Sequence, residues 1–270
     1  MQIGSRQFDL INDAYIMGIL NVTPDSFSDG GRWNDMDKCL KHVEKMIRDG
    51  ASIIDIGGES TRPGYVKISH EEEITRIVPV IERLKQEFDV PLSVDTYKGA
   101  VAEAAIIAGA DMINDVWGFK GDGLMATVAA KYDVPCCIMH NRDVKTRPYK
   151  NFIEDVLNDL RGSINIGLSA GVKKDKLITD PGIGFGKNYE ENLFMMNKLE
   201  ILREIGCPVL LGTSRKSMIG LALDLPVSER LEGTIATTVL GIMKGCSIIR
   251  VHDVKENYRA MKMTKTILNV

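Results

Sequence analysis

The chain has 270 residues, of which 44% are hydrophobic and 26% are charged, as is usual for a globular protein. This composition excludes a disordered chain, a collagen-like repeat and a disulfide-stapled miniprotein. The formal net charge is -3, from 34 basic and 37 acidic side chains, so no basic domain points to nucleic-acid binding.

Short apolar runs typical of strands alternate along the chain with longer segments that have helical periodicity. The runs are nearly continuous in Ile, Val, Leu and Met, as in a parallel sheet that is buried on both faces. Eight runs in 270 residues give a unit of about 34 residues, close to the spacing of a (β/α)8 barrel. The predicted strands are Tyr15–Asn21, Ser52–Gly57, Leu92–Asp95, Met112–Val116, Pro135–His140, Leu177–Asp180, Val209–Gly212 and Ser247–His252.

The segments between the strands have the marks of amphipathic helices. Apolar residues recur at steps of three and four over residues 36–47 and again over residues 74–84. The second of these helices is predicted to begin at Ser69, with Glu72 three residues later in a capping-box arrangement. Left-handed glycines are expected to follow three of the helical runs. They are Gly50, Gly109 and Gly206.

Nearly every predicted strand ends in a polar residue that is followed by a loop. In a barrel all these ends meet at one mouth, whereas in an open sheet they would spread along a line. An alternative for some of these residues is that they only cap the following helix. We therefore predict an α/β fold, a single (β/α)8 (TIM) barrel domain over residues 1–270. The polar ends are Asn21, Asp55 with Glu59, Asp95, Asn114 with Asp115, His140, Asp180, Ser214 with Lys216, and Arg250 with His252.

The first and second loops after strands are long for this fold, over residues 21–31 and 57–64. Their Gly and Pro residues predict sharp turns, including a type II turn at Pro63-Gly64. Phe27 at the tip of the first loop suggests that this loop closes over a ligand, although a solvated loop is the alternative. Oxygen-bearing residues such as Asn21 suit Mg²⁺, which reaches proteins through few ligands plus substrate phosphates.

The polar strand ends fall into two charge groups. Asp95, Asn114 and Asp180 offer acceptors suited to a heterocycle whose amino group lies beside a ring N–H, and Lys216 can balance their charge or bind the ring. The alternative for each Asp is a salt bridge inside the barrel.

Arg250 and His252 form the second group, on the last strand. Because they are two residues apart, their side chains point to the same side and can cradle a phosphate or diphosphate. The alternative is an Arg250–Asp253 pair beside a histidine that only packs.

Several common catalytic motifs are missing from the sequence. The glycines at 182, 184 and 186 fit neither a Walker A loop nor a dinucleotide fingerprint, and His70 has no second histidine four residues later. No GxSxG nucleophile elbow stands out either. These absences disfavour an NTPase, a zinc hydrolase and a serine hydrolase.

Cysteine use and hydropathy point to a cytoplasmic protein. The five cysteines lack CxxC spacing and are expected to be reduced thiols. Residues 1–15 have no apolar stretch behind a basic one, so no signal peptide is expected, and no apolar run is long enough to cross a membrane.

Motifs over residues 14–254 resemble the dihydropteroate synthase family, in the family's order. The strings are NVTPDSFSDGG from Asn21, DIGGESTRPG from Asp55, SVDT from Ser93, INDV from Ile113, MH at Met139, DPGIGFGK from Asp180, SRKS from Ser214 and RVHDV from Arg250.

The resemblance implies an enzyme of folate biosynthesis that is the target of sulfonamides. Such an enzyme joins (7,8-dihydropterin-6-yl)methyl diphosphate to 4-aminobenzoate, giving 7,8-dihydropteroate and diphosphate. It also implies a homodimer that uses Mg²⁺. Among the implied site residues, Asp95, Lys216, Arg250 and His252 would be catalytic. The implied substrate-binding set is Thr61, Arg62, Asp95, Asn114, Asp180, Lys216, Ser217, Arg250 and His252, with Asn21 as the metal ligand.

Two stretches depart from the family pattern. The fifth loop continues from His140 as Asn141-Arg142-Asp143, where the family often has Met and a Gln- or Gly-containing turn, so its role stays open. Trp117 stands where a small residue is more typical.

Two other functions are compatible with parts of the pattern. A pterin-binding methyltransferase barrel also carries Asp and Asn at its strand ends, but it does not require the SRKS segment, the Arg-x-His pair and the first loop together. A non-catalytic binding subunit would be free to lose its charged ligands, and this chain keeps them.

Overall fold

The structure is a computed structural model that describes residues 1–22, 31–59 and 66–270. Eight parallel strands form one sheet in the order β8-β7-β6-β5-β4-β3-β10-β9. A bridge between Thr179 and Val209 joins its two ends, so the sheet closes into a barrel. The strands are β3 (Tyr15–Asn21), β4 (Ala51–Gly57), β5 (Leu92–Asp95), β6 (Met112–Asp115), β7 (Cys136–Met139), β8 (Leu177–Asp180), β9 (Leu210–Leu211) and β10 (Ile248–Val251).

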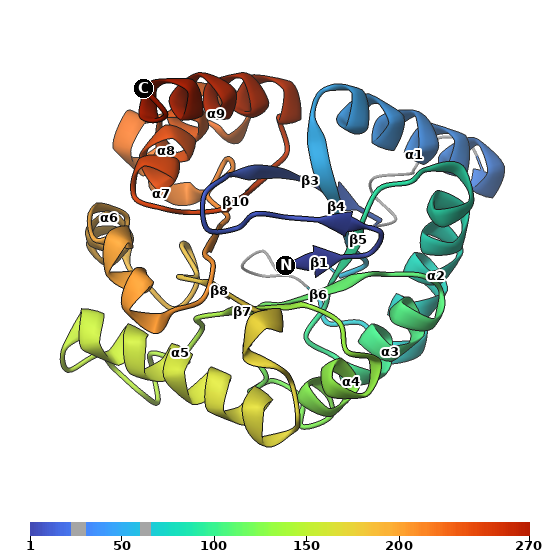
Figure 1. The fold of residues 1–270 in the computed structure, drawn as a ribbon, viewed down its shortest axis with the longest axis horizontal. Coiled ribbons are helices and arrows are strands. Elements are labelled where there is room, and N and C mark those ends of the chain that lie inside the picture. Colours follow the sequence, from blue (N-terminus) through green and yellow to red (C-terminus); the bar gives the residue numbers. More distant parts are fainter. Residues whose placement is uncertain (23–30, 60–65) are drawn as a thin grey trace.

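Helices surround the barrel, as the view down its axis shows (Figure 1). They are α1 (Gly31–Arg48), α2 (His70–Glu87), α3 (Gly99–Ile107), α4 (Met125–Tyr132), α5 (Phe152–Ser169), α6 (Tyr189–Asn197), α7 (Ser217–Leu223), α8 (Leu231–Met243) and α9 (Val254–Leu268). Short 3-10 helices cover Lys174–Lys176, Leu199–Ile205 and Val227–Glu229. The larger apolar core lies between this ring and the outward faces of the strands.

The predicted barrel is confirmed, with strand ends that differ from the prediction by at most one residue. At the start of α2, Ser69 Oγ accepts a hydrogen bond of 3.1 Å from the Glu72 amide, as predicted for the helix cap. The Glu72 side chain does not complete a capping box, because it pairs with Arg76 one turn later. The three glycines expected after helices all have positive φ, which is +111° at Gly50, +115° at Gly109 and +72° at Gly206.

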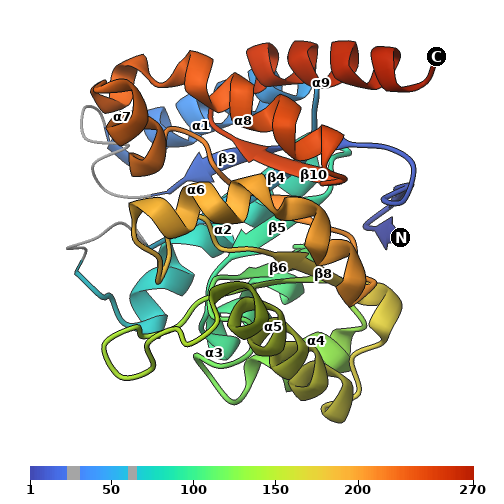
Figure 2. The ribbon, with the colours of Figure 1, turned by 90° about the vertical axis from the view of Figure 1, so that its left-hand side faces the viewer.

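A two-stranded hairpin, β1 (Gln2–Ile3) and β2 (Arg6–Gln7), was not predicted from the sequence. It crosses the centre of the barrel in Figure 1 and lies beyond one end of the strands in Figure 2. Its segment contributes Ile3, Phe8 and Leu10 to a second apolar cluster inside the barrel. We call this cluster the floor; its remaining buried members are Met17, Ile53, Met112, Cys137, Ile178, Leu210 and Ile248.

Candidate functional site

The strand period of two places the predicted site residues on the inward face, directly above the floor. Counting two residues on from Ile53, Met112, Ile178 and Ile248 gives four of the polar strand ends. These are Asp55, Asn114, Asp180 and Arg250. The strand register agrees, because Asp55 lies opposite Ser93, and Asp95 lies opposite Asn114. We call this carboxyl end of the strands the mouth.

Arg250 joins two carboxylates across the mouth. Its Nε donates to Asp55 Oδ2 and its Nη2 donates to Asp95 Oδ2, both at 2.6 Å. Asn114 Nδ2 donates to the same oxygen of Asp55 at 3.0 Å. The Asp55 side chain is fully buried and that of Asp95 is 12% exposed. The network therefore joins three predicted site residues, Arg250, Asp95 and Asn114, to Asp55 through direct hydrogen bonds.

Two oxygens of this network have no hydrogen-bond partner within the part of the chain that the structure describes. They are the buried Oδ1 atoms of Asp55 and Asp95. Burial raises the pKa of Asp95 to about 7, with Arg250 opposing the shift and Asp55 adding to it. Because buried acceptors are rarely left unpaired, these oxygens are suited to N–H donors of a ligand.

A second wall of the mouth comes from β8 and the loop before α7. Asp180 Oδ1 accepts a hydrogen bond of 2.6 Å from the Gly182 amide. Lys216 Nζ donates to the Ile183 carbonyl and lies 4.8 Å from the centre of the Phe185 ring. Burial raises the pKa of Asp180, while Lys216 opposes that shift. Burial also lowers the pKa of Lys216 to about 8.

Glycines on β4 and after β9 face the side chains of both walls. A methyl group placed on Gly57 would lie 3.8 Å from Asp95 Oδ2 and 3.9 Å from Asn21 Oδ1. One placed on Gly212 would lie 3.9 Å from both Asp180 Oδ2 and Arg250 Cδ. The side chains of Asn21, Asp95, Arg250 and Asp180 thus form one continuous lining.

His252 lies at the outer edge of the mouth. Its Nδ1 is 2.9 Å from Ser214 Oγ, which also accepts a 3.1 Å hydrogen bond from the His252 amide. The alternative Arg250–Asp253 pair is wrong, because Arg215 binds Asp253 through Nε at 2.8 Å and Nη2 at 2.5 Å. Arg250 is left to Asp55 and Asp95.

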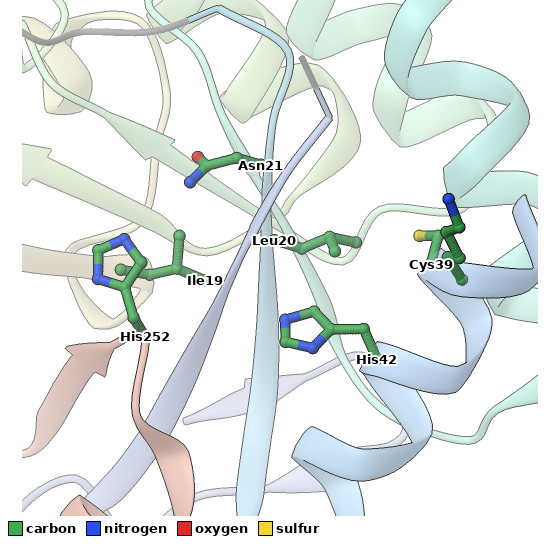
Figure 3. Close-up of a pocket in the computed structure, with 7 residues that line it drawn as sticks. Ile19, Leu20, Asn21, Cys39, His42 and His252 are labelled. Atoms are coloured by element: carbon green, nitrogen blue, oxygen red, sulfur yellow. The ribbon is translucent and has the colours of Figure 1, made fainter. Parts of the chain in front are cut away.

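A cavity of about 300 Å³ opens beside His252 and Asn21 (Figure 3). In the close-up, Asn21 and His252 lie on one side of β3, while Leu20 and His42 lie on the other. Lys38, Cys39 and Ile19 complete the lining. Within the described residues, no group of three or more His, Cys, Asp or Glu side chains could hold a metal without a substrate.

The other predicted residues fall at the rim or outside the description. Ser217 is exposed at the first residue of α7, one position after Lys216. Thr61, Arg62, Phe27 and the Pro63-Gly64 turn lie outside the described residues.

Asp55 was counted among the polar strand ends but not selected as a site residue. The signal that could have selected it is the shared pattern of Asp55-Ile-Gly57 and Ser93-Val-Asp95, in which alternate residues face inward. His140 and Lys187 were missed as a pair because they are 47 residues apart in the sequence.

Comparison with known proteins identifies the family. Residues 17–252 match the family described as "Pterin binding enzyme". The chain is 64% identical over 269 residues to the dihydropteroate synthase of Clostridium beijerinckii, covering 99% of both chains. It is 58% identical to that of Bacillus subtilis, covering 94% of this chain and 88% of the relative.

Solved structures give the same result. A Clostridium difficile dihydropteroate synthase, crystallised in the presence of pteroic acid, superposes with a TM-score of 0.93 at 53% identity, over 97% of this chain and 99% of that one. The Yersinia pestis enzyme with a sulfonamide drug superposes with a TM-score of 0.92 at 42% identity, over 100% and 99%. The chain therefore belongs to the pterin-binding enzyme family and, within it, to the dihydropteroate synthases.

Proposed function

We propose that Asp95, Asn114, Asp180 and Lys216 bind the pterin ring of the diphosphate substrate in this dihydropteroate synthase, with Asp55 as a further acceptor. The observation that carries this assignment is the pair of buried Oδ1 atoms on Asp55 and Asp95. A pterin presents an amino group and ring N–H groups that would satisfy such acceptors, and Lys216 can donate to its ring oxygen or nitrogen. Both walls of the mouth would then bind the same pterin ring.

The diphosphate is assigned to the edge of the mouth that holds His252 and Arg250. The two described hydrogen bonds of Arg250 use two of the five N–H donors of a guanidinium, which leaves others for an anion. His252 faces the cavity that Asn21 also lines. Both residues can then stabilise the negative charge that gathers on the leaving diphosphate.

A Mg²⁺ ion fits this edge as a partner of the substrate. Asn21 Oδ1 and the carboxylate of Asp95 flank the same point above Gly57. Mg²⁺ commonly binds through one or two protein oxygens together with substrate phosphates. Asn21 would hold the ion, and when bound the ion supplies charge that neutralises diphosphate.

The proposed mechanism is displacement at the pterin methylene carbon. Its C–O bond to diphosphate breaks with the electron pair leaving on oxygen. The amino nitrogen of 4-aminobenzoate forms the new C–N bond and loses a proton to diphosphate or water. Asp95 stabilises the positive charge that the ring shares with the methylene carbon, because its carboxylate lies in a site with little solvent.

The second substrate is assigned to the rim. Ser217 is exposed beside Lys216, at the first residue of α7, where an anionic carboxylate is favoured. Thr61 and Arg62 are also proposed to bind substrate, and both lie outside the described residues.

We also propose a homodimer in the cytoplasm. Support for a partner surface comes from apolar side chains on neighbouring helices: Leu221 and Leu223 of α7 are 65% and 49% exposed, and Met243 of α8 is 58% exposed. The five cysteines are all free and buried, which suits a reducing compartment. No helix in the described ranges is long and apolar enough to cross a membrane.

Asp95→Asn tests the proposed mechanism. We expect the variant to fold and bind pterin, but to lose about 10²–10³ in turnover, the range for removing one preorganised stabilising group. The measurements are diphosphate release that depends on 4-aminobenzoate and Mg²⁺, and pterin affinity by calorimetry. Asp175→Asn, at an exposed carboxylate far from the mouth, is the matched control. Equal losses of turnover and of pterin affinity would refute the cation-stabilising role.

A further inference from the structure

A second group of buried charges lies behind the mouth, between β7, α5 and the loop that follows β8. Its centre is Lys187, the last residue of the DPGIGFGK string. The Lys187 Nζ atom lies 2.9 Å from the Gly182 carbonyl, 3.1 Å from the Phe185 carbonyl and 2.9 Å from His140 Nδ1. An ammonium group has three N–H donors, so these three acceptors satisfy it completely.

The contact with Lys187 fixes the state of the His140 ring. Burial lowers the pKa of Lys187 to about 7, and its ammonium form can only donate. Toward that form Nδ1 accepts, so the ring proton of neutral His140 is on Nε2. Nε2 lies 3.3 Å from Asp159 Oδ2, which is a close contact but not a hydrogen bond by its geometry, and Nε2 has no hydrogen-bond partner within the described residues. Burial lowers the pKa of His140 to about 3, although the contact with Asp159 opposes this shift, so the ring is neutral at physiological pH.

Asp159 is anchored by the fifth loop, whose role the sequence left open. Arg142 Nε donates to Asp159 Oδ2 at 2.8 Å, and Arg147 Nη2 donates to Oδ1 at 2.9 Å. The Arg142 guanidinium also lies 4.5 Å from the centre of the Tyr149 ring, and the Tyr149 hydroxyl donates to the Gly186 carbonyl at 2.7 Å. The fifth loop thus holds Asp159 in place beside His140, and it contacts the loop after β8 through the Tyr149–Gly186 hydrogen bond.

The loop over residues 181–187 faces the mouth on its other side. Its Gly182 amide binds Asp180, and its Ile183 carbonyl accepts from Lys216. Three of its residues have left-handed backbones, with φ of +68° at Gly182, +83° at Gly184 and +53° at Gly186. A methyl group at Gly182 would come within 1.9 Å of the His140 carbonyl, so the loop packs tightly on β7. A loop with this backbone needs hydrogen bonds to its own carbonyl groups to stay in one conformation.

We propose that Lys187, oriented by His140 and Asp159, is a positioning residue that fixes the 181–187 loop and with it the pterin-binding atoms of Asp180 and Lys216. Lys187 acts from behind the loop and touches no substrate. The proposal rests on the pterin-binding roles proposed above for Asp180 and Lys216. It also gives the fifth loop a function in this chain, because Arg142 supports Asp159.

Lys187→Met is the first test, since it keeps the length of the side chain and removes the three donors. We expect pterin affinity to fall about 10- to 100-fold, the equivalent of about 1.4–2.8 kcal/mol, as for lost hydrogen bonds to a charged group. Amide hydrogen exchange should accelerate at residues 182–186 and not across β3 and β4. The exposed Lys198→Met is the matched control and should change neither quantity.

Two substitutions of His140 separate positioning from mere packing. Asn places an acceptor where Nδ1 was and keeps the bond to Lys187, whereas Gln places its amide nearer Nε2 and loses that bond. We expect His140→Asn to retain pterin affinity within about threefold of the wild type, and His140→Gln to approach the loss seen in Lys187→Met, a difference of about 1 kcal/mol.

The outcomes distinguish this inference from the function on which it rests. If Lys187→Met keeps the wild-type pterin affinity and loop exchange while Asp180→Asn loses affinity, the positioning role is wrong and the binding site stands. If Asp180→Asn also binds pterin normally, the assignment of the binding site itself is wrong. Should Lys187→Met fail to fold, equal pterin affinities in His140→Asn and His140→Gln would overturn the proposal.

Discussion

The two ends of the barrel are built from the same strands but hold opposite kinds of side chain. At the floor, Ile53, Ile178 and Ile248 pack against the N-terminal hairpin in an apolar cluster. Two residues further along each strand, the inward positions are Asp55, Asp180 and Arg250. A step of two residues therefore separates an apolar layer that stabilises the fold from the polar layer to which we assign substrate binding.

The two layers contribute to the stability of the fold in opposite directions. Removing apolar surface from water stabilises the floor, whereas each buried and unpaired oxygen at the mouth costs about 1–3 kcal/mol. Asp55 and Asp95 each carry one such oxygen. The mouth is held in a form that is unfavourable without ligand, and the floor and outer core supply the stability that permits it.

Phe8→Ala should have the largest effect on stability, and it tests the floor. Phe8 is 3% exposed, and its ring centre lies 4.8 Å from that of Tyr15. Truncating a buried Phe costs about 3–5 kcal/mol through lost transfer energy and the cavity left behind. Denaturant unfolding measures the loss, and the KM for the pterin substrate should stay unchanged at temperatures where the variant is folded.

The control for Phe8→Ala comes from the same N-terminal segment. Ile11 is 91% exposed, so Ile11→Ala should leave the free energy of unfolding within about 0.5 kcal/mol of the wild type. If Phe8→Ala and this control have the same free energy of unfolding, the N-terminal segment does not stabilise the barrel.

Arg250→Lys tests the mouth with a smaller expected effect. Lysine keeps the positive charge but loses the fork that reaches Asp55 and Asp95 together. We expect kcat/KM to fall by about 10- to 100-fold, from the loss of about 1.5–3 kcal/mol in charged hydrogen bonds. Steady-state kinetics measures it, and the unchanged kinetics of an exposed substitution such as Arg161→Lys is the reference. Wild-type kinetics in Arg250→Lys would show that the fork has no role.

Much of this arrangement could be predicted because it follows from periodicity. The strand runs and their polar ends gave the barrel, and the spacing of Arg250 and His252 placed both on one side of β10. The cap at Ser69 was also predictable, because an N-cap depends on residues three positions apart.

What could not be predicted depends on contacts between distant segments. The bonds of Arg250 reach Asp55 and Asp95, which are 195 and 155 residues away. The role of Arg142 depends on Asp159 in α5, and the short β1–β2 hairpin has too few residues for a periodic signal. Periodicity shows which face a side chain occupies, while its partners are set by closure of the barrel.

A pH dependence of stability is also expected, and it belongs to the mouth and not to the floor. Burial raises the pKa of Asp95 from 3.8 to about 7, so the folded protein keeps a proton there that the unfolded chain releases. The stabilisation is fully present below pH 3.8 and is lost as the pH rises through about 7.

Asp95→Asn removes this titration and leaves Asp115, whose pKa burial raises to about 6, in both proteins. The free energy of unfolding of the variant should therefore rise relative to the wild type by up to about 3 kcal/mol between pH 4 and pH 7, the size that a pKa shift from 3.8 to about 7 gives. Urea unfolding across this range measures the difference. Phe8→Ala should show a difference from the wild type that does not vary with pH, because the floor holds no titratable side chain other than a buried cysteine. A pH-independent difference for Asp95→Asn would mean that the carboxylate of Asp95 is ionised in the folded protein throughout this range.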